Sequence, residues 1–428
     1  MRVLVLGSGG REHALAKFLA QSPHVSHVLC APGNAGTDEV GENVSGDLSK
    51  LDSMVALAKE RNVDLTIVGP EAPLCAGIVD RFQAAGLSIF GPTAAAARIE
   101  GDKAYAKRLM KRAHVPTAEA RIFDRYNEAR DYVATRDAGV VVKASGLAAG
   151  KGVVVCPEPA EALVALEQIM LHRQFGDAGG TVVVEEILRG QELSIHAFVD
   201  DRTIYVLDSA QDHKAVGDGD VGPNTGGMGA YSPAPIATDD VLRIVEREVL
   251  VPIVDALRGE GSPYRGVLYA GLMLTPAGPK VLEFNCRFGD PETQVLLSRL
   301  DCDVFELLSA VVDGRLDQAE VRWKSDSAVC VVMASGGYPG DYQRGKRIEG
   351  LDRASALPGV HVFHAGTRRQ GSEVASSGGR VLAVTALGST SADAKLRAYE
   401  AVDMIHFEKA FCRRDIADKA MNAAGSLK

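Results

Sequence analysis

The first hundred residues alternate short apolar runs with longer segments whose apolar residues recur at helical spacing. The apolar runs predict strands and the periodic segments predict helices, in the order strand 2–7, helix 11–22, strand 27–32, helix 51–62, strand 64–69 and helix 78–86. We expect the first helix to be amphipathic. Strands separated by helix-length segments predict a parallel, doubly wound sheet, with ligands at the carboxyl ends of its strands.

From about residue 102 the pattern changes to apolar runs joined by short turns. The segments VVVKASGLAAGKGVVVC (140–156) and TVVVEEILRGQELSIHAFVDD (181–201) each predict two strands around a turn, which indicates a small antiparallel domain. A further hairpin is expected over 267–287, and the residues from about 321 onward combine apolar strands with a helix at 391–405. The expected fold class is therefore mixed, with α/β and α+β parts.

Composition narrows the class of protein. With 428 residues, of which 46% are hydrophobic and 24% charged, the chain is expected to form about three globular domains at ~150 residues each. A net charge of −9 argues against a nucleic-acid partner, and the lack of an apolar run of ~18 residues argues against a membrane partner. The first residues enter a strand directly, so we expect no signal peptide.

Seven cysteines are scattered along the chain without a C-x-x-C pair, which favours mostly buried free thiols over disulfides or a zinc site. The expected location is the cytoplasm. Any anionic substrate must be held by local basic groups, because the chain as a whole is acidic. For the oligomeric state, a monomer or a weak homo-oligomer is expected.

The first glycine turn, GSGGREH, lies between a predicted strand and a predicted helix. Backbone N–H groups at a helix N-terminus suit a phosphate, so Gly9 and Gly10 are candidate ligand contacts, with a tight structural turn as the alternative. A dinucleotide motif G-x-G-x-x-G would need glycine where Glu12 stands, and the acidic residue ~20 positions further on is not evident. NAD binding is therefore disfavoured.

A sharper signal is Lys143 followed by a glycine-rich loop, in which Gly146, Gly150, Lys151 and Gly152 lie between two β-branched strands. A Walker-type P-loop has a different spacing and opens a helix, whereas a loop between strands can fold over phosphates as a flap. Lys143, at the end of the first strand, would supply a positive charge. A mobile hairpin with a surface lysine is the alternative.

Two carboxylates, Glu185 and Glu186, end the next apolar strand, so the alternation of side chains directs one of them inward. Together with Glu192 they are candidates for accepting hydrogen bonds from an adenine amino group or from ribose hydroxyls. Solvated carboxylates at a strand end are the alternative.

The segment KVLEFNCRFGDPETQ (280–294) contains the most informative group of candidate binding residues. In a strand with period two, Glu283, Asn285 and Arg287 project to one face, and the intervening apolar residues, from Leu282 on, project to the other. A carboxylate and an amide oxygen on one face are hard ligands suited to Mg²⁺, which takes a few protein ligands and phosphate oxygens. The sequence therefore predicts a metal site at Glu283 and Asn285.

Arg287 lies beside this pair, where its guanidinium could clamp a carboxylate or phosphate through two parallel hydrogen bonds. A surface ion-pair network with Asp290 and Glu292 is the alternative.

The polar, glycine-rich segment 208–235 is long for a loop in a compact enzyme, which favours a binding loop over disorder. His13 and His213 could act as acids or bases, but neither has an evident nucleophile partner. The sequence has no G-x-S-x-G, H-E-x-x-H or Cys–His signature, so chemistry without a protein nucleophile is favoured.

Together these segments resemble the ATP-grasp superfamily and, within it, the phosphoribosylamine–glycine ligase family, also called glycinamide ribonucleotide synthetases. The stretches that carry the resemblance span nearly the whole chain in family order: GSGGREHAL, APGNAGT, LTIVGPEAPL, IFGPT, KASGLAAGKGV, AQDHK, GPNTGGMGAYSP, YAGLM, LEFNCRFGDPETQ, GGYPGDY, VFHAG and GGRVLAVTALG. RFGDPETQ and GPNTGGMGAYSP are highly specific, whereas the glycine loop alone would indicate only the superfamily.

The resemblance implies an N-terminal Rossmann-like domain with a doubly wound parallel sheet at 1–101, an ATP-grasp domain at 102–320 and a C-terminal α/β domain at 321–428. Within the second domain, about 116–189 is expected to form a small, mobile antiparallel lid. The implied reaction joins glycine to 5-phosphoribosylamine, with ATP, to give glycinamide ribonucleotide, ADP and phosphate through glycyl phosphate. The implied cofactor is Mg²⁺ or Mn²⁺, and the implied pathway is purine biosynthesis.

The resemblance also implies residue roles. Catalysis is expected to depend on Lys143, Arg287 and Asp290, and the metal on Glu283 and Asn285. The residues expected to contact ATP are Lys103, Lys143, Gly146, Gly150, Lys151, Gly152, Glu185, Glu186, Ile187, Leu188 and Glu192. Those expected to contact the other substrates are Gly9, Gly10, Arg11, Glu12, Asn34, Pro70, Glu71, Asp212, Lys214, Asn224, Thr225, Gly226, Gly227, Met228 and Arg287.

Two positions depart from the family pattern. Ala210 stands where serine is common before QDHK, and Ser145 stands in the glycine loop where other members have aspartate. Ser145 would change the electrostatics of the loop if it touched a phosphate or a lysine. Three other functions stay open at this point: another ATP-grasp ligase or carboxylase, a nucleotide-binding protein without turnover, and an NAD-dependent oxidoreductase.

Overall fold

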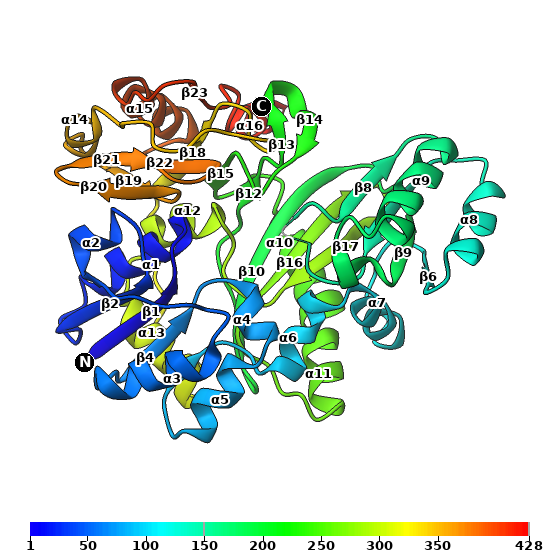
Figure 1. Ribbon diagram of the computed structural model, residues 1–428, viewed down its shortest axis with the longest axis horizontal. Helices are drawn as coiled ribbons and strands as arrows, with labels where there is room; N and C mark the ends of the chain where they lie inside the picture. The colour runs from blue at the N-terminus through cyan, green and yellow to red at the C-terminus, as the bar shows by residue number, and fades with distance from the viewer. Residues whose placement is uncertain (149, 427–428) are drawn as a thin grey trace.

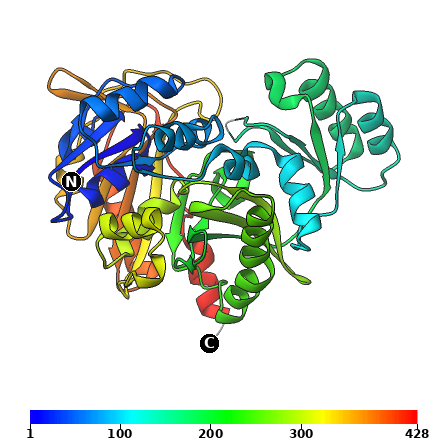
Figure 2. The same ribbon diagram turned by 90° about the horizontal axis from the view of Figure 1, so that it is seen from below.

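The computed structural model describes residues 1–148 and 150–426 (Figure 1). Ala149, within the predicted glycine loop, lies outside the described residues. The N-terminal residues and the C-terminal sheet lie side by side on one half of the molecule, and the lid extends away on the other half (Figures 1 and 2). A central antiparallel sheet lies between them.

The N-terminal part is a parallel sheet with the strand order β3-β2-β1-β4-β5. Its strands are β1 (Arg2–Gly7), β2 (His27–Pro32), β3 (Glu42–Asn43), β4 (Leu65–Val68) and β5 (Ile89–Phe90). Its helices are α1 (Gly10–Leu19), α2 (Thr37–Val40), α3 (Leu51–Glu60), α4 (Glu71–Cys75) and α5 (Ile78–Ala84). The apolar residues 3–6 are fully buried, as expected for a parallel strand covered on both faces.

Helix α1 is not amphipathic, so that prediction is wrong. Nine of its ten residues are buried, including Arg11 and His13. The reason is tertiary: α1 packs on its own sheet and also against α12 (Glu292–Arg299) and β19 (Val360–His364), so it has no face left for solvent. Local periodicity carries no information about this second covering layer.

The lid is an antiparallel sheet with the strand order β6-β9-β7-β8, and the strand–turn–strand unit predicted at 140–156 is confirmed by the pairing of β7 with β8. The second predicted unit, at 181–201, is not a hairpin, because its first strand pairs within the lid and its second strand, Gln191–Asp200, pairs within the central sheet. Its elements are β6 (Ala120–Phe123), α8 (Tyr126–Ala134), β7 (Val140–Ala144), β8 (Val153–Cys156), α9 (Pro159–Leu166) with a π-helical turn at Glu167–Leu171, a 3₁₀ turn at Gly176–Gly179, and β9 (Val182–Glu186). Residues of this sheet and of α8 and α9 form a hydrophobic cluster of their own. The hydrophobic core of this unit is therefore separate from the two larger clusters of the chain.

The central sheet has the antiparallel order β11-β10-β16-β17. Its strands are β10 (Gln191–Asp200), β11 (Ile204–Val206), β16 (Arg265–Thr275) and β17 (Gly278–Asn285). The helices of this region are α6 (Ala94–Gly101), α7 (Lys103–Arg112), α10 (Asp239–Val245) continued by a π-helical turn at Glu246–Leu250, α11 (Val251–Gly259) and α13 (Val304–Asp313), followed by a 3₁₀ turn at Leu316–Gln318. The hairpin predicted over 267–287 is confirmed by the antiparallel pairing of β16 with β17.

The third sheet has the order β12-β15-β18-β22-β19, with β23 also paired to β18. Its elements are β12 (Gln211–Asp212), β15 (Gly229–Ser232), β18 (Ser327–Ser335), α14 (Leu351–Ser355), β19, β22 (Arg380–Gly388), α15 (Ser391–Met404), β23 (Ala410–Phe411) and α16 (Asp418–Ser426). Two hairpins form separate ribbons, β13 (Ala215–Gly217) with β14 (Val221–Asn224), around a 3₁₀ turn at Asp218–Asp220, and β20 (Thr367–Gln370) with β21 (Glu373–Ser376). Strands β12 and β15 come from the predicted binding loop, so this sheet draws on residues before and after position 320.

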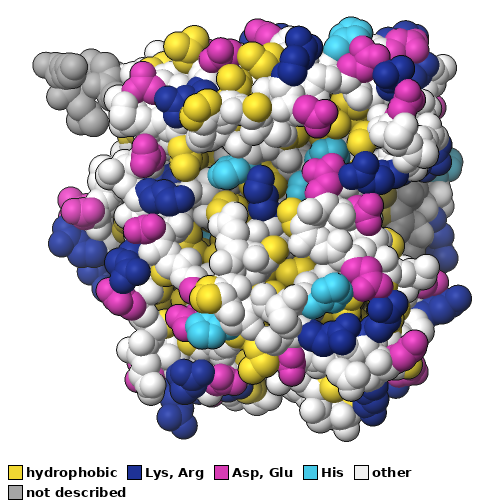
Figure 3. Space-filling model, turned by 90° about the vertical axis from the view of Figure 1, so that its left-hand side faces the viewer, with side chains coloured by type: hydrophobic (Ala, Val, Ile, Leu, Met, Phe, Trp, Pro, Cys, Tyr) yellow, Lys and Arg dark blue, Asp and Glu magenta, His cyan; other side chains and the backbone are white. Residues whose placement is uncertain are grey.

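The outer surface carries charges of both signs. On the face shown in Figure 3, Lys and Arg side chains are interspersed with Asp and Glu. All seven cysteines are free, and Cys30, Cys156, Cys286 and Cys330 are buried, which confirms the prediction of unpaired thiols. Among the described residues, no helix is both long and apolar enough to cross a membrane.

Four histidines make the stability of the fold dependent on pH. Burial, which disfavours the charged imidazolium, lowers the pKa values of His196, His213, His361 and His364 to about 4. The unfolded chain, with histidine pKa values near 6.5, therefore binds more protons than the folded chain below that pH. Stability is fully present above about pH 6.5 and is lost as the pH falls towards about 4.

We expect the free energy of unfolding in urea to fall between about pH 7 and about pH 5.5, by about 1 kcal/mol for each buried histidine. The matched variant is His361→Gln, which removes one such group and should show a smaller fall. An equal fall in the free energy of unfolding in the variant and in the parent chain would contradict the lowered pKa of His361.

Candidate active site

One cavity of the molecule lies where the lid, the central sheet and the other two parts of the chain meet. It has a volume of about 530 Å³, which is typical of sites for small ligands. Its lining includes Arg11 and Glu71 from the N-terminal part, Glu185 from the lid, Glu283 from β17 and Arg380 from β22. A ligand that fills this cavity would therefore contact every part of the chain.

Most of the residues that the sequence marks out line this cavity. They are Arg11, Glu71, Lys103, Lys143, Gly150, Gly152, Glu185, Glu186, Ile187, Leu188, Glu192, Asp212, Lys214, Asn224, Thr225, Gly226, Glu283, Asn285, Arg287 and Asp290. The marked residues outside the lining are Gly9, Gly10, Glu12, Asn34, Pro70, Gly146, Lys151, Gly227 and Met228. The structure thus brings the predicted nucleotide, metal and substrate groups together, and leaves most of the first glycine turn apart from them.

The first glycine turn is closed by its own helix. The Glu12 carboxylate accepts a hydrogen bond from the Gly9 N–H at 2.5 Å and another from Arg11 Nε at 2.5 Å. The Glu12 side chain also fills the space between this turn and Gly69, which follows β4, since a Cβ placed on Gly69 would lie 1.9 Å from Glu12 Oε1. These contacts favour the alternative of a tight structural turn, while substrate contacts at Gly9, Gly10 and Glu12 stay a prediction. Arg11 is the residue of this turn that lines the cavity.

Other marked residues outside the lining have structural partners. Asn34 Nδ2 donates to the backbone oxygens of Ser8 at 2.9 Å and His364 at 2.8 Å, which ties the N-terminal part to β19. Gly146 packs so closely that an added Cβ would lie 2.7 Å from Ala178 Cα. Met228 is fully buried.

Ser145, one of the two departures from the family pattern, contacts the start of α7. Its Oγ donates to Asp102 Oδ1 at 2.8 Å and accepts from the Ala104 N–H at 2.9 Å. Asp102 is the N-cap of α7 and also accepts from the Tyr105 N–H. Ser145 therefore helps to hold the helix that carries Lys103 into the cavity.

A β-bulge in β17 sets the positions of the predicted metal ligands. Glu283 pairs with Gly271, but the next residue of β16 pairs with Val281, so Leu282 is the extra residue of the bulge. Leu282 consequently lines the cavity together with Glu283 and Asn285. The predicted alternation is wrong at Leu282, because the bulge shifts the pleat by one position.

Glu283 is surrounded by positive charge. Burial opposes its ionisation, but Lys214, Lys103 and Lys143 together outweigh burial and lower the pKa of this carboxyl. The nearest of the three cations, Lys214 Nζ, lies 3.9 Å from Glu283 Oε1. An ionised carboxylate and the amide oxygen of Asn285 on one wall of the cavity are the oxygen ligands that Mg²⁺ or Mn²⁺ prefers.

Glu185 lies buried between two lysines. Its carboxylate oxygens are 2.9 Å from Lys143 Nζ and 3.1 Å from Lys107 Nζ, and all three side chains are less than a tenth exposed. Burial lowers the pKa of Lys107 to about 8, against the opposing effect of Glu185. Glu186 instead lies at the surface and pairs with Lys280 at 3.0 Å. The prediction that one of the two glutamates points inward is confirmed.

Arg287 is held by two carboxylates from earlier in the chain. Its Nε lies 3.1 Å from Glu71 Oε2, and its Nη2 lies 3.0 Å from Glu100 Oε1. Close by, Asp290 Oδ2 lies 3.1 Å from Arg380 Nη2. These pairs line the cavity and Glu100 is only 8% exposed, so the alternative of a surface ion-pair network is wrong.

Lys214 and Asp212 extend from the predicted binding loop into the cavity. Lys214 Nζ lies 3.3 Å from Glu192 Oε2, and this carboxylate raises the pKa of Lys214 well above its usual range, against burial. Burial, followed by the negative charge of Glu292, raises the pKa of Asp212 well above its usual range. Glu292 Oε1 in turn accepts a hydrogen bond from Tyr269 OH at 2.6 Å.

Several cavity residues were missed by the sequence reasoning, among them Lys107, Glu100, Tyr269 and Arg380. Lys107 follows Lys103 by four residues on α7, so helical spacing could have indicated it. Arg380 gave no signal, because its contacts with Asp290 join residues that are 90 positions apart in the chain.

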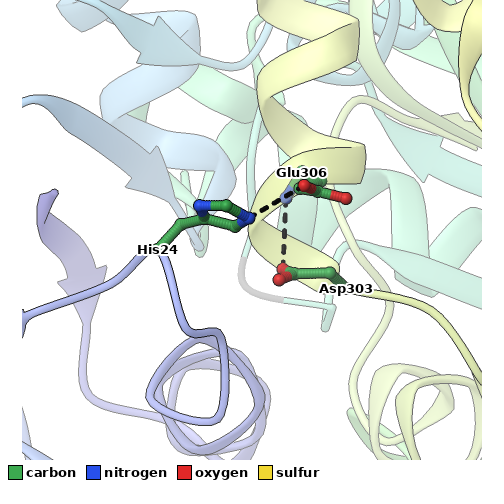
Figure 4. Close-up of side chains that lie close together, drawn as sticks. All are labelled: His24, Asp303 and Glu306. Carbon is green, nitrogen blue, oxygen red and sulfur yellow. Dashed lines mark hydrogen bonds and ion pairs between the residues drawn. The ribbon is translucent and has the colours of Figure 1, made fainter.

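A second group of potential metal ligands lies away from the cavity that contains Glu283 (Figure 4). Its members are His24, Asp303 and Glu306. His24 Nε2 lies 2.9 Å from Glu306 Oε1, with both side chains more than half exposed. Asp303 caps α13 by accepting from the N–H groups of Phe305 and Glu306. These contacts account for the group as a helix N-cap with a surface ion pair.

The comparisons with known proteins agree with this geometry. Models of phosphoribosylglycinamide synthetase match the chain in three parts: the N domain at residues 1–100, the ATP-grasp (A) domain at 101–293 and the C domain at 328–419. A phosphoribosylamine–glycine ligase of Rhodopirellula baltica is 52% identical over 99% of this chain and 98% of its own length. The chain belongs to the phosphoribosylamine–glycine ligase family. A second ligase of that name, from Vibrio cholerae, is 51% identical over 98% of this chain and 99% of its own length.

Solved structures agree with the family assignment. The crystal structure of phosphoribosylamine–glycine ligase from Thermotoga maritima has a TM-score of 0.83 and 33% identity, covering 97% of this chain and 100% of that chain. The biotin carboxylase domain of the Hydrogenobacter thermophilus 2-oxoglutarate carboxylase, solved with MgADP, ADP and bicarbonate, has a TM-score of 0.74 at 18% identity, covering 96% and 91%. The predicted ATP-grasp fold is confirmed, and the chain is an ATP-dependent ligase of purine biosynthesis.

The buried Glu185 gives a direct test of the charge arrangement. Glu185→Gln leaves Lys107 and Lys143 buried without their carboxylate, so we expect the free energy of unfolding to fall by about 3 kcal/mol. The neighbouring change Glu186→Gln, at an exposed pair, should cost less than about 1 kcal/mol. Urea titrations of the two variants measure the difference, and equal costs would contradict the buried arrangement.

Proposed function

We propose that the cavity joins glycine to 5-phosphoribosylamine, with ATP as the energy source, to give glycinamide ribonucleotide, ADP and phosphate. The observation that carries the proposal is the oxygen pair of Glu283 and Asn285 with three lysines around it, in a chain of this ligase family. Phosphoryl transfer needs positioning and compensation of negative charge more than a protein nucleophile.

The first step activates glycine. A carboxylate oxygen of glycine attacks the γ-phosphorus of ATP, the bond from that phosphorus to the bridging oxygen breaks, and ADP leaves glycyl phosphate behind. The ammonium groups of Lys103 and Lys143, which line the cavity near Glu283, compensate the charge that shifts between the phosphates.

The second step forms the amide. The amino nitrogen of phosphoribosylamine attacks the acyl carbon, the acyl C–O bond breaks, and phosphate leaves while the nitrogen releases a proton. We assign Arg287 and Asp290 to the glycine end of the cavity. We assign Asp212, Lys214 and residues 224–226, with Arg11 and Glu71, to phosphoribosylamine.

The donor set fits a divalent cation. Glu283 is ionised, because nearby lysines lower the pKa of its carboxyl against burial, and Asn285 presents an amide oxygen on the same wall. We assign Mg²⁺ or Mn²⁺ to these two residues, where the bound ion would neutralise phosphate charge. Lys214 Nζ lies 3.9 Å from Glu283 Oε1, at the edge of this donor set.

The nucleotide is assigned to the lid side of the cavity. Ile187 and Leu188 line that side with Glu186 and form the adenine slot, and Glu192 is assigned to the ribose. Glu185 keeps Lys143 and Lys107 in position, since both of its oxygens already face lysines.

The glycine loop is assigned as the flap over the phosphates. Gly150 and Gly152 line the cavity, and Gly150 has a φ of +75°, a conformation that glycine adopts without strain. Lys151 Nζ donates to Pro339 O at 3.3 Å, so the flap reaches the C-terminal part of the chain. A closed flap would protect glycyl phosphate from water.

We further propose a cytoplasmic location, which the seven free thiols support, and a monomeric or weakly associating chain.

The metal assignment is tested by Glu283→Gln. We expect kcat to fall by about 100-fold or more, because charge held at the metal matters most in the transition state, while the Kd for ADP changes little. Steady-state ADP release with glycine and phosphoribosylamine, together with calorimetric binding of ADP, measures both quantities. Glu248→Gln, at an exposed pair with Arg247, is the matched control.

Near-normal turnover of Glu283→Gln at saturating Mg²⁺ would remove the metal assignment. ADP release by the parent chain that requires neither glycine nor phosphoribosylamine would remove the proposed reaction itself.

A further inference from the structure

The hairpin of β13 and β14, residues 215–224, does not belong to any of the larger sheets. Its two strands pair with each other and with no further strand of the described residues, and β14 is exposed along its whole length. The hairpin nevertheless lies between two groups of cavity residues, Lys214 just before it and Asn224, Thr225 and Gly226 at its end. The hairpin therefore connects these residues, which are also held by Thr225 Oγ1 donating to Lys214 O at 2.8 Å and by Arg380 Nη1 donating to Gly226 O at 2.6 Å.

The contacts that fix this hairpin come from the far end of the chain. Arg413, whose side chain is 1% exposed, donates from Nη1 to Ala215 O at 3.0 Å and to Asp220 Oδ1 at 2.9 Å. The same guanidinium is held by Asp415 through two parallel bonds, from Nε at 2.8 Å and from Nη2 at 2.6 Å. A fork held in this way fixes the direction of the remaining donors.

Neighbours of Arg413 reinforce the contact. Asp415 Oδ2 accepts from the Gly219 N–H at 2.8 Å, Asp218 Oδ1 accepts from the Arg414 N–H at 2.8 Å, and Lys419 Nζ lies 2.6 Å from Asp220 Oδ2. Segment 413–419 therefore contacts the first strand and the turn of the hairpin. We refer to this segment as the C-terminal clasp.

The alternation of side chains connects the clasp to the cavity. Asp212 and Lys214 line the cavity, whereas His213 between them does not and is 1% exposed. Burial, with Lys419 and Arg413 as the nearest cations, lowers the pKa of His213 to about 4. Asp212 and Lys214 thus face the cavity, and His213 between them faces the clasp.

We propose that Arg413 is a positioning residue of the ligase: it holds the 215–224 hairpin so that Lys214 and residues 224–226 face phosphoribosylamine. The inference rests on the proposed assignment of these residues to that substrate. Arg413 lies outside the cavity lining, so its effect passes through the hairpin. Loosening the hairpin weakens the binding of phosphoribosylamine most, because Lys103, Lys143 and Arg287, which are assigned to the phosphates and glycine, lie outside the hairpin and the residues beside it.

Steady-state kinetics at saturating ATP and glycine test the proposal, with phosphoribosylamine formed in the assay from ribose 5-phosphate and ammonia. For Arg413→Gln we expect the KM for phosphoribosylamine to rise about tenfold, with kcat within about twofold and the Kd for ADP unchanged. Arg413→Lys, which keeps the charge without the fork, should rescue part of the loss. The adjacent change Arg414→Gln, at an exposed pair with Asp403, is the matched control and should leave all constants unchanged.

A second variant covers the case in which Arg413→Gln does not fold. Asp220→Asn acts at a side chain that is 43% exposed and weakens the same contact from the hairpin side. We expect the KM for phosphoribosylamine to rise about threefold. Amide hydrogen exchange should become faster at residues 215–226 and stay unchanged in β18.

The outcomes separate this proposal from the assignment on which it rests. Lys214→Met removes a cavity side chain directly, so an unchanged KM for phosphoribosylamine in that variant would reject the substrate assignment. A raised KM in Lys214→Met together with unchanged KM values in folded Arg413→Gln and Asp220→Asn would reject the role of Arg413. Equal rises in the KM values for ATP, glycine and phosphoribosylamine would show a general loss of structure and would also overturn it.

Discussion

Charges that line a cavity shielded from water have to be compensated, and this requirement ties the parts of the chain together. Glu185 on the lid neutralises Lys143 and reaches Lys107 on α7. Asp290, from the segment after the central sheet, pairs with Arg380 of the C-terminal sheet. Each pair joins elements that are remote in sequence, so the site exists only when these elements have assembled.

The same pairs prepare the site for anionic substrates. Three lysines lie around Glu283, where a triphosphate and its metal are proposed to bind. Groups already fixed by neighbouring charges lose little freedom when substrate binds, which favours catalysis through preorganisation. The lid has a hydrophobic core of its own, but it carries Glu185 and Lys143, so the charge arrangement is complete only when the lid lies against α7 and the central sheet.

The sequence predicted features that depend on neighbours along the chain. The parallel N-terminal sheet follows from short apolar runs separated by helices, and the inward Glu185 follows from alternation in β9. Features that depend on distant packing could not be read in this way. Nothing local shows that α1 is covered on a second side, that Leu282 forms a bulge, or that Arg380 reaches the cavity. The family resemblance marked Glu12 as a substrate contact, which stays a prediction; in the structure its carboxylate accepts a hydrogen bond from the Gly9 N–H at the start of α1.

A crystal structure with a non-hydrolysable ATP analogue, Mg²⁺ and glycine tests these site assignments most directly. We expect the adenine beside Ile187 and Leu188, the metal on Glu283 and Asn285, and the glycine carboxylate between Arg287 and the γ-phosphate. A nucleotide bound elsewhere, or a metal held by other residues with Glu283 still paired to Lys214, would contradict these assignments.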